Sequence, residues 1–349
     1  MLGHSTGYRY PSRKGTSNMM TYHVCALGNA LVDTEIEVSE SDLNTLGIEK
    51  GLMTLVDEER QHFLQQNLSD HLVMSKRACG GSAANTVISL SQFGGKSFLS
   101  CKVAGDENGQ FYLQDLADNG VDHNIQAQIT EGITGKCLVM ITDDADRTMN
   151  TFLGTSADLS TADIHADAIE NSEYLYIEGY LVTGASSLQA VHRACDIARA
   201  AGTKIALSLS DPGIVEHFHE SLKAIIGNGI DLLFCNKQEA LSWCKTDNLD
   251  QALEHLQTTA AQFAVTLCSQ GAVVFDGTDY LHAPPQPVTA VDTNGAGDMF
   301  AGAYLYGITQ GYSCLSSAVF ANRAASAVVS QYGPRLHSAE YIGLKDGLQ

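Results

Sequence analysis

The stretch "VDTNGAGDMFAGAYLYG", Val291 to Gly307, places two aspartates around a turn that has almost no side chains, and a helix-like run follows it. The first backbone N–H groups of a helix lack partners, and the helix dipole is positive there. Tiny side chains let a phosphate approach such a turn closely, without any basic side chain. We therefore expect an anion hole formed by Gly295, Ala296 and Gly297.

Asp298 follows this turn directly, in the first turn of the expected helix. A carboxylate beside a bound phosphate repels it, so its presence suggests that it handles a proton. It is placed to accept one from a hydroxyl group that attacks a phosphoryl group. The alternative is structural: Asp292 or Asn294 caps the helix, and the glycines only permit the turn.

Bulk composition limits the possible partners of this 349-residue chain. Its formal charge of −20 argues against nucleic acid and anionic membranes, because phosphate-binding surfaces are basic. No window reaches the roughly 18 apolar residues of a membrane span. A small anionic ligand held by backbone amides remains compatible with this charge.

The N-terminal residues 1–20 lack the apolar core of a secretory signal, and we interpret them as a disordered tail or an over-long gene start. The nine cysteines include no C-x-x-C pair, and many lie in apolar runs. This usage predicts a reduced, cytoplasmic protein in which cysteine serves as a small hydrophobic residue. The twelve histidines show no metal-ligand spacing.

Apolar strands alternate with helices along most of the chain, which predicts an α/β fold with a mainly parallel sheet covered by helices on both faces. Ligands of such sheets bind beyond the carboxyl ends of the strands, where the conspicuous polar residues fall. Two segments do not fit, because they resemble half-exposed strands: about 32–52, and 132–154 with a hairpin turn at 143–146. We expect them to form a small β lid on a domain that covers 21–349.

Three motifs in this order resemble the PfkB, or ribokinase-like, family of carbohydrate and nucleoside kinases. They are "GGSAANT" from Gly80, "NKQE" from Asn236 and "DTNGAGD" from Asp292, and the resemblance covers about 22–332. It implies a Rossmann-like domain with a β lid over the acceptor site, ATP as phosphoryl donor, and Mg²⁺. It also implies that Asp298 is the catalytic base.

The same resemblance implies an acceptor site near the start of the chain. Gly80 and Gly81 would let the backbone approach the acceptor, and Asn85 would offer an amide to its hydroxyl groups. In the "GNALVD" segment, Asn29 and Asp33 would bind substrate, with Asp33 accepting from two vicinal hydroxyls; the alternative for Asp33 is a turn residue.

On the nucleotide side, Asn236 and Glu239 would organise Mg²⁺ largely through water, although the same residues could form a capping box. "TLCSQGA" resembles the family's T-x-G-x-x-G turn, with Thr266 and Gly271 kept and Cys268 in place of the first glycine. Asn322 would lie near the adenine, or be an ordinary polar helix residue.

The lid residue Arg147 would close on the phosphates, because a guanidinium suits dispersed phosphoryl charge; the alternative is an exposed surface arginine. "GNALVD", "YIEGYL" and "RTMNTFLG" resemble adenosine-kinase-type members, which implies transfer to the 5′-hydroxyl of adenosine. A purine needs an apolar slot, to which Leu138, Met140 and Phe152 could contribute, or they could pack the lid onto the domain.

Several alternatives stay open at this point. The acceptor could be a ribose- or fructose-like sugar, or the chain could be a non-catalytic nucleotide-binding sensor. A dinucleotide dehydrogenase is excluded, because no G-x-G-x-x-G follows the first strand. A monovalent cation is a further candidate cofactor, and the protein could be a monomer or a homodimer.

Overall fold

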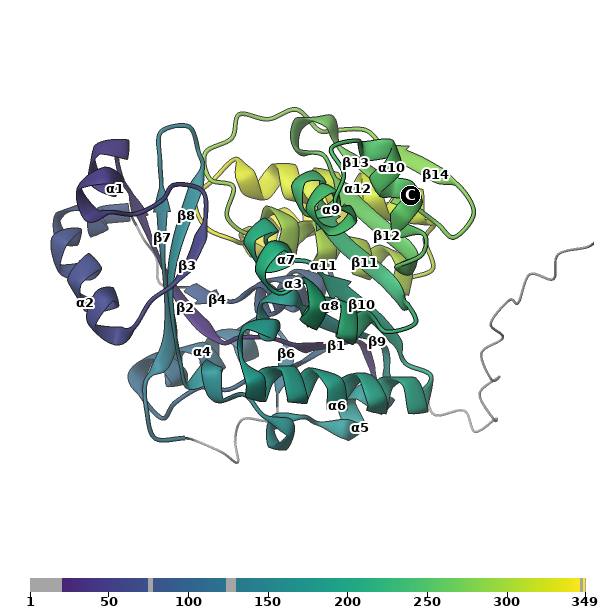
Figure 1. Cartoon of the computed structure of the whole chain (residues 1–349), viewed down its shortest axis with the longest axis horizontal. Coiled ribbons are helices and arrows are strands. Elements are labelled where there is room, and N and C mark those ends of the chain that lie inside the picture. Colours follow the sequence, from purple (N-terminus) through teal and green to yellow (C-terminus); the bar gives the residue numbers. More distant parts are fainter. Residues whose placement is uncertain (1–20, 75–77, 124–129, 346–347, 349) are drawn as a thin grey trace, which may run out of the picture.

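A computed structural model describes residues 21–74, 78–123, 130–345 and 348 (Figure 1). The predicted tail, residues 1–20, lies outside the described residues. The described part contains a large mixed α/β body and a smaller lid, drawn on the left of Figure 1. The fold class predicted from the sequence is confirmed.

The body is built on a nine-stranded sheet. Neighbouring strands are parallel except for the β12–β13 and β13–β14 pairs, which are antiparallel. The order across the sheet is β14 (Tyr280–Ala283), β13 (Ala272–Phe275), β12 (Ala260–Thr266), β11 (Ile230–Asn236), β10 (Lys204–Ser208), β9 (Ser172–Glu178), β1 (Tyr22–Leu27), β5 (Ser97–Ser100) and β6 (Val121–His123).

Helices cover both faces of this sheet, as the alternation of side chains along the interior strand β1 requires. Val24 and Ala26 belong to one apolar core, and Cys25 and Leu27 belong to the other. The first core is covered by α3 (Ser82–Gln92), α4 (Glu107–Asp118), α11 (Ala296–Thr309), α12 (Cys314–Val329) and α13 (Ser338–Lys345). The second is covered by α5 (Ala166–Glu170), α6 (Ala185–Ala201), α7 (Pro212–His217), α8 (His219–Ile226), α9 (Lys237–Cys244) and α10 (Leu249–Leu256).

The lid is a five-stranded sheet with the order β3 (Met53–Leu55), β8 (Arg147–Gly154), β7 (Thr134–Ile141), β2 (Leu31–Glu37) and β4 (Ala78–Gly80). The hairpin predicted in 132–154 is the β7–β8 pair. Two helices that the sequence analysis did not anticipate, α1 (Glu40–Leu46) and α2 (Glu58–Asn67), cover one face of this sheet. Short 3-10 helices occur at Ser69–Met74, Thr155–Asp158, Thr161–Asp163, Gly179–Thr183 and Cys268–Gln270.

The register of the lid decides which side chains can reach a ligand. Leu138 and Met140 of β7 are fully buried in the small core beneath α1 and α2, together with Ile36. Phe152 pairs with Lys136 and shares their face by the two-residue alternation of strands. Leu138 and Met140 therefore do not contribute to a purine slot, which was one of the two roles left open for them, because they point to the helix-covered face.

Helices α3 and α11 approach each other closely enough to bring the two glycine motifs together. A Cβ atom built on Gly302 would lie 2.4 Å from the backbone oxygen of Thr86. No side chain fits between the two helices at this point. The close packing therefore depends on glycine in the middle of α11.

We predict that Gly302→Ala lowers the free energy of unfolding by about 1–3 kcal/mol, because the methyl group must push the α3 backbone away. Urea denaturation followed by circular dichroism measures this change. Gly343→Ala, in α13, is the matched control, since a Cβ there meets no atom within 4 Å. Equal stability of the two variants would contradict the close packing.

Candidate active site

The N-terminus of α11 is open, as the anion-hole prediction requires. Its N-cap is Gly295, with φ of 72°, and no side chain caps the helix. The capping alternative is excluded, because Asp292 instead accepts hydrogen bonds from the Asn294 N–H (2.8 Å) and the Gly333 N–H (3.0 Å). A Cβ atom built on Gly297 meets nothing within 4 Å, so the space beside the turn is free.

Asp298 lies at this open end and is held by two donors from α3. Its Oδ1 accepts a hydrogen bond from the Ser82 hydroxyl (2.6 Å), and its Oδ2 accepts one from the Asn85 amide (3.1 Å). Burial raises the pKa of Asp298, while Ser82, Asn85 and the positive charge of Arg147 act in the opposite direction. Asp298, the predicted base, is thus oriented by two residues. One is Asn85, for which the sequence analysis predicted a contact with the acceptor, and the other is Ser82, which the sequence analysis did not name.

The predicted acceptor residues of β2 and β4 lie against each other. Gly80 pairs with Leu31, and a Cβ atom on Gly80 would lie 1.9 Å from the Asp33 carboxylate. Gly81 has φ of 93°, and a Cβ atom there would meet the Asn29 carbonyl oxygen at 2.1 Å. Both glycines therefore permit close approach of backbone and carboxylate within the protein, and their approach to an acceptor stays a prediction.

Asp33 is buried, and its carboxylate has no hydrogen-bond partner in the part of the chain that the structure describes. Burial raises its pKa well above the usual range, and the nearby Glu35 carboxylate adds to the increase, while Arg335 opposes it. A buried carboxylate without donors is ready to accept hydrogen bonds from hydroxyl groups of a ligand.

Asn29 is positioned by a residue that the sequence analysis did not name. Glu178, at the end of β9, accepts hydrogen bonds from the Asn29 backbone (2.7 Å), the Asn29 side-chain amide (2.8 Å) and the Ala83 N–H at the start of α3 (2.8 Å). Burial raises the pKa of Glu178 to about 7. Glu178 therefore ties the loop after β1 to the helix that holds Asp298.

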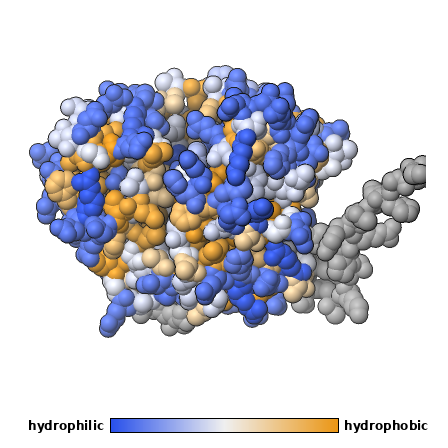
Figure 2. Space-filling view, viewed as in Figure 1, coloured by the Kyte–Doolittle hydropathy of each residue, from blue (hydrophilic) through white to orange (hydrophobic). Residues whose placement is uncertain are grey.

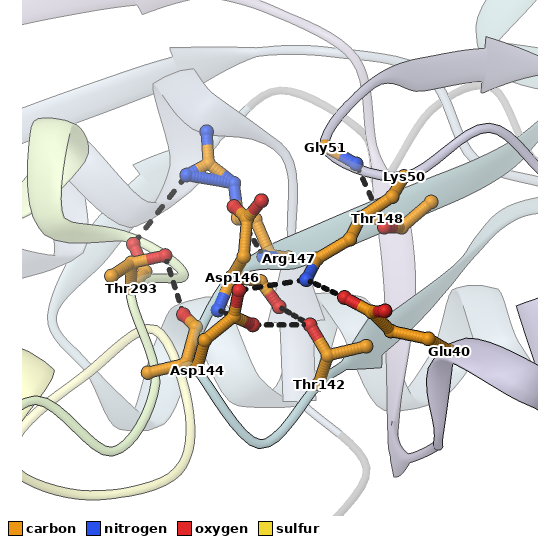
Figure 3. Close-up of polar contacts among 10 residues, drawn as sticks. Glu40, Lys50, Gly51, Thr142, Asp144, Asp146, Arg147, Thr148 and Thr293 are labelled. Carbon is orange, nitrogen blue, oxygen red and sulfur yellow. Dashed lines mark hydrogen bonds and ion pairs between the residues drawn. The ribbon is translucent and has the colours of Figure 1, made fainter.

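The lid hairpin reaches over the turn before α11 (Figure 3). The Arg147 guanidinium donates to the Thr293 carbonyl oxygen (3.4 Å), and the Thr293 hydroxyl donates to the Ala145 carbonyl oxygen (3.1 Å). Lys50 bonds both Glu40 and Asp144 at the hairpin tip (2.8 and 2.7 Å). Arg147 is thus no isolated surface side chain, because it spans from the lid to the anion-hole turn.

On the other side of the site, Asn236 and Glu239 form the capping box that was one of the two interpretations. The Glu239 carboxylate accepts from the Asn236 N–H (3.0 Å) and side-chain amide (2.6 Å), and the Asn236 oxygen accepts from the Glu239 N–H (2.9 Å). Burial raises the pKa of Glu239 to about 7, with a contribution from Asp211, whereas Arg147 acts to lower it. Glu239 is therefore coupled to both Arg147 and Asp211.

The remaining predicted nucleotide residues follow the same edge of the sheet. Thr266 is the register partner of Asn236 on the neighbouring strand. Gly271 has φ of 85° and approaches the Ala283 carbonyl oxygen, while Cys268, in place of the family glycine, takes a left-handed φ of 51°. Asn322 donates to the Ala283 and Pro284 carbonyl oxygens (both 3.0 Å), and no hydrogen bond joins it to Asp298 among the described residues.

Four residues of the site escaped the sequence analysis: Ser82, Glu178, Asp211 and Arg335. Ser82 follows the two glycines, and Asp211 follows a buried strand, so position after a motif or a strand end could have indicated both. Glu178 ends strand β9 inside the quoted "YIEGYL" segment, so its place at a strand end could have indicated it as well. Arg335 acts through Asp115, far along the chain, and no local pattern marks it.

Three general features of the described residues bear on function. In the described part of the chain, no helix is long and apolar enough to cross a membrane. All nine cysteines are free. Within residues 21–74, 78–123, 130–345 and 348, no three His, Cys, Asp or Glu side chains lie together so that they could ligate a metal ion directly.

Comparison with known proteins supports the family resemblance that the three motifs indicate. A model of the pfkB family of carbohydrate kinases matches residues 50–340. The structure of an adenosine kinase from Sinorhizobium meliloti is 32% identical, with a TM-score of 0.87, over 93% of this chain and 99% of that one. A probable sugar kinase from Rhizobium etli CFN 42 is also 32% identical, with a TM-score of 0.87, over 93% and 100%.

Among curated proteins, an adenosine kinase from Saccharomyces cerevisiae is 27% identical over 335 residues, which is 90% of this chain and 97% of that protein. The similarity therefore spans both the body and the lid.

We predict that Asp298→Asn lowers turnover in phosphoryl transfer by about 10²–10⁴-fold, the usual contribution of a positioned base. Nucleotide binding should be nearly unchanged, because the main-chain N–H groups of the turn remain. Single-turnover kinetics and calorimetric titration with nucleotide measure the two effects. Asp196→Asn, on the exposed face of α6, is the control, and near-normal turnover of Asp298→Asn would remove this residue from the mechanism.

Proposed function

The chain belongs to the pfkB family of carbohydrate kinases and is a phosphotransferase with an alcohol group as acceptor; on this premise we propose that it transfers the γ-phosphoryl group of ATP to the 5′-hydroxyl of adenosine. The family membership favours an enzyme over the non-catalytic sensor, and the site retains the base, the open helix end and the lid arginine.

The inner face of the lid carries the proposal for a nucleoside acceptor. Register partners share a face in both types of pairing, so Asp33 lies on the same face as Cys137 and Thr151. By the two-residue alternation, Val139 and Met149 continue this face, and they form an apolar cluster with Cys137, Ile141 and Leu31. Asp33 thus stands beside an apolar cluster in which Leu31 and Met149 are the partly exposed members. A carboxylate beside an apolar contact suits a ribose joined to a flat base.

The surface around the lid adds support. Figure 2 shows apolar residues gathered over the lid and over the adjoining part of the body, with polar residues around the rim. Leu52 and Leu55, which flank and end β3, are 38% and 45% exposed, and Met53 packs against the apolar core of the body. Exposed apolar side chains of this kind are common where a ligand or partner is covered.

In the mechanism that follows, Asp33 accepts hydrogen bonds from the ribose hydroxyls and orients the acceptor. Asp298 removes the proton from the attacking hydroxyl, while Asn85 and Ser82 keep its carboxylate in place. The N–H groups at the start of α11 stabilise the negative charge that develops on the transferring group. Because Asp298 must be ionised and its pKa is raised, activity is lost as the pH falls through that pKa.

Arg147 acts from the lid. Its guanidinium is anchored at the Thr293 carbonyl, next to the anion hole, and it influences Asp298, Glu239 and Asp211. When ATP binds, the same side chain can contact phosphate oxygens that lie between these groups. It therefore supplies positive charge that the acidic surroundings lack.

The residues present fit a water-mediated Mg²⁺ site. The two Glu239 oxygens accept hydrogen bonds from Asn236 but each retains a further lone pair, and the Asp211 carboxylate lies close enough to raise the pKa of Glu239. Mg²⁺ keeps much of its water and binds through few carboxylates together with substrate phosphates. When bound, it would neutralise phosphate charge, with Glu239, Asn236 and Asp211 holding its water ligands.

We also propose a reducing, cytoplasmic setting for the enzyme. Six of the nine free cysteines are buried. Burial raises the pKa of the Cys195 thiol to about 11, for example, so it stays protonated. Buried free thiols of this kind serve as small hydrophobic residues, as is usual in proteins of reducing compartments.

A second acceptor class is supported by the equal similarity to the probable sugar kinase. The deciding experiment measures ADP release from Mg-ATP with adenosine, inosine, guanosine, ribose and fructose as acceptors. We expect the highest kcat/KM with adenosine, because only a nucleoside occupies both Asp33 and the apolar lid face. Higher efficiency with ribose or fructose would replace the nucleoside proposal with the sugar one.

We predict that Arg147→Ala lowers kcat by about 10³-fold or more, the range found for arginines that stabilise phosphoryl transfer. The KM of the acceptor should change little, since Arg147 faces the phosphates. Steady-state and single-turnover kinetics separate the two quantities. Arg193→Ala, at an exposed position of α6, is the control; a change confined to acceptor KM would make Arg147 an acceptor contact instead.

A further inference from the structure

The segment Gln331–Leu336, which follows α12, crosses the site and contacts several of its parts; we call it the C-terminal strap. Its Gly333 N–H donates to Asp292 (3.0 Å), the aspartate that shapes the anion-hole turn. Pro334 packs so closely on Gly295 that a Cβ atom there would lie 2.6 Å from it. Tyr332 donates to Glu37 of the lid strand β2 (3.5 Å).

Arg335 anchors the strap on the acceptor side. Its guanidinium forms an ion pair with Asp115 of α4 (2.9 Å) and donates to the carbonyl oxygen of Cys79, the residue before Gly80. The side chain is only 13% exposed. Its Nε–H is also buried and has no hydrogen-bond partner in the described part of the chain. A buried arginine with a spare donor is unusual, because unmet buried donors are costly.

The charge around Asp33 shows what this arginine can do there. The charged groups that act on Asp33 most strongly are Glu35 on its own strand, Asp298 of α11, Asp292 of the turn and Arg335 of the strap. The Cys137 thiol faces it from β7, and burial raises the pKa of that thiol. Three of the four charges repel an ionised Asp33, and only Arg335 attracts it.

We propose that Arg335 is a positioning residue for acceptor binding: its contacts with Asp115 and the Cys79 carbonyl oxygen fix β4 against Asp33, and its guanidinium places one positive charge near the carboxylate that receives the acceptor hydroxyls. The inference rests on the proposed function, because it assigns to Asp33 the binding of the acceptor. Arg335 itself does not touch the reacting atoms.

The proposal has a distinct pH signature. Arg335 lowers the pKa of Asp33, so removal of its charge raises that pKa further. Acceptor binding needs the ionised carboxylate and is lost as the pH falls through this pKa. Removal of Arg335 therefore moves the loss of acceptor binding to higher pH, whereas a merely structural contact would leave its position unchanged.

The test compares Arg335→Gln, Arg335→Lys and Asp115→Asn in the full-length protein, with Arg199→Gln as the matched control. Arg199 likewise donates to a main-chain carbonyl, that of Ile225 on the opposite face of the sheet. Kinetics are measured from acid to neutral pH with Mg-ATP and both adenosine and the best acceptor of the panel. Thermal unfolding is recorded for every variant.

For Arg335→Gln we expect the KM of the acceptor to rise about 10–100-fold, because the loss of one charge-assisted contact usually has an effect of this size. The kcat and the KM of ATP should stay nearly unchanged. The acid limb of kcat/KM for the acceptor should move to higher pH. Arg335→Lys, which keeps the charge, should leave the acid limb near that of the parent. Asp115→Asn, which frees the guanidinium but keeps its charge, should raise the acceptor KM with little shift of the limb.

The proposal would be overturned if the pH profile of kcat/KM for the acceptor were the same in Arg335→Gln and in the parent. It would also be overturned if the substitution impaired kcat, the KM of the acceptor and the KM of ATP to the same extent. If Arg335→Gln does not fold, an unchanged acceptor KM in both Arg335→Lys and Asp115→Asn overturns it equally. Failure of adenosine as a substrate would instead refute the nucleoside proposal, and the best acceptor of the panel would still decide the role of Arg335.

Discussion

Burial of several carboxylates around the end of one helix is the constraint on which this site depends. Asp33, Glu35, Glu178, Asp292 and Asp298 are all largely removed from water, and burial raises the pKa of each. Such groups are costly unless donors or opposite charges compensate for the lost hydration. Backbone N–H groups serve Asp292 and Glu178, the Asn294 amide serves Glu35 (3.0 Å), and Ser82 and Asn85 serve Asp298. Among the described residues, Asp33 has no hydrogen-bond donor, and this exception is what supports its proposed role in binding an acceptor hydroxyl.

The same compensation couples the lid to the body. Asn294 donates to Glu35 of β2, and Arg147 and Ala145 of the hairpin both contact Thr293. Each of these contacts ends within two residues of Gly295, so the position of the lid and the shape of the anion hole depend on each other. A lid displaced from this position would separate Glu35 from its amide donor. The contacts therefore link the position of the lid to the shape of the turn before α11.

The parts of the site that depend on short-range geometry could be predicted from the sequence. The open helix end follows from Gly295 and Gly297, the capping box from Asn236 and Glu239, and the body from its alternating strands and helices. The direction of the lid side chains could not be predicted, because one residue of register exchanges the faces of a strand, and the sequence left both roles open for Leu138. Arg335 pairs with Asp115 across 220 residues, a contact that depends on the folded chain.

The overall charge of −20 makes an anionic substrate a demanding ligand for this protein. The general field of the chain repels ATP, so binding must rely on groups within a few ångströms, where low dielectric strengthens each interaction. The α11 N-terminus contributes positive potential without a charged side chain, and Arg147 adds one cation from the lid. Arg335 is bound to Asp115 and lies near Asp33, on the side proposed for the acceptor. In the proposed mechanism, one arginine acts on the phosphates and the other on the acceptor carboxylate, so that neither has to neutralise both.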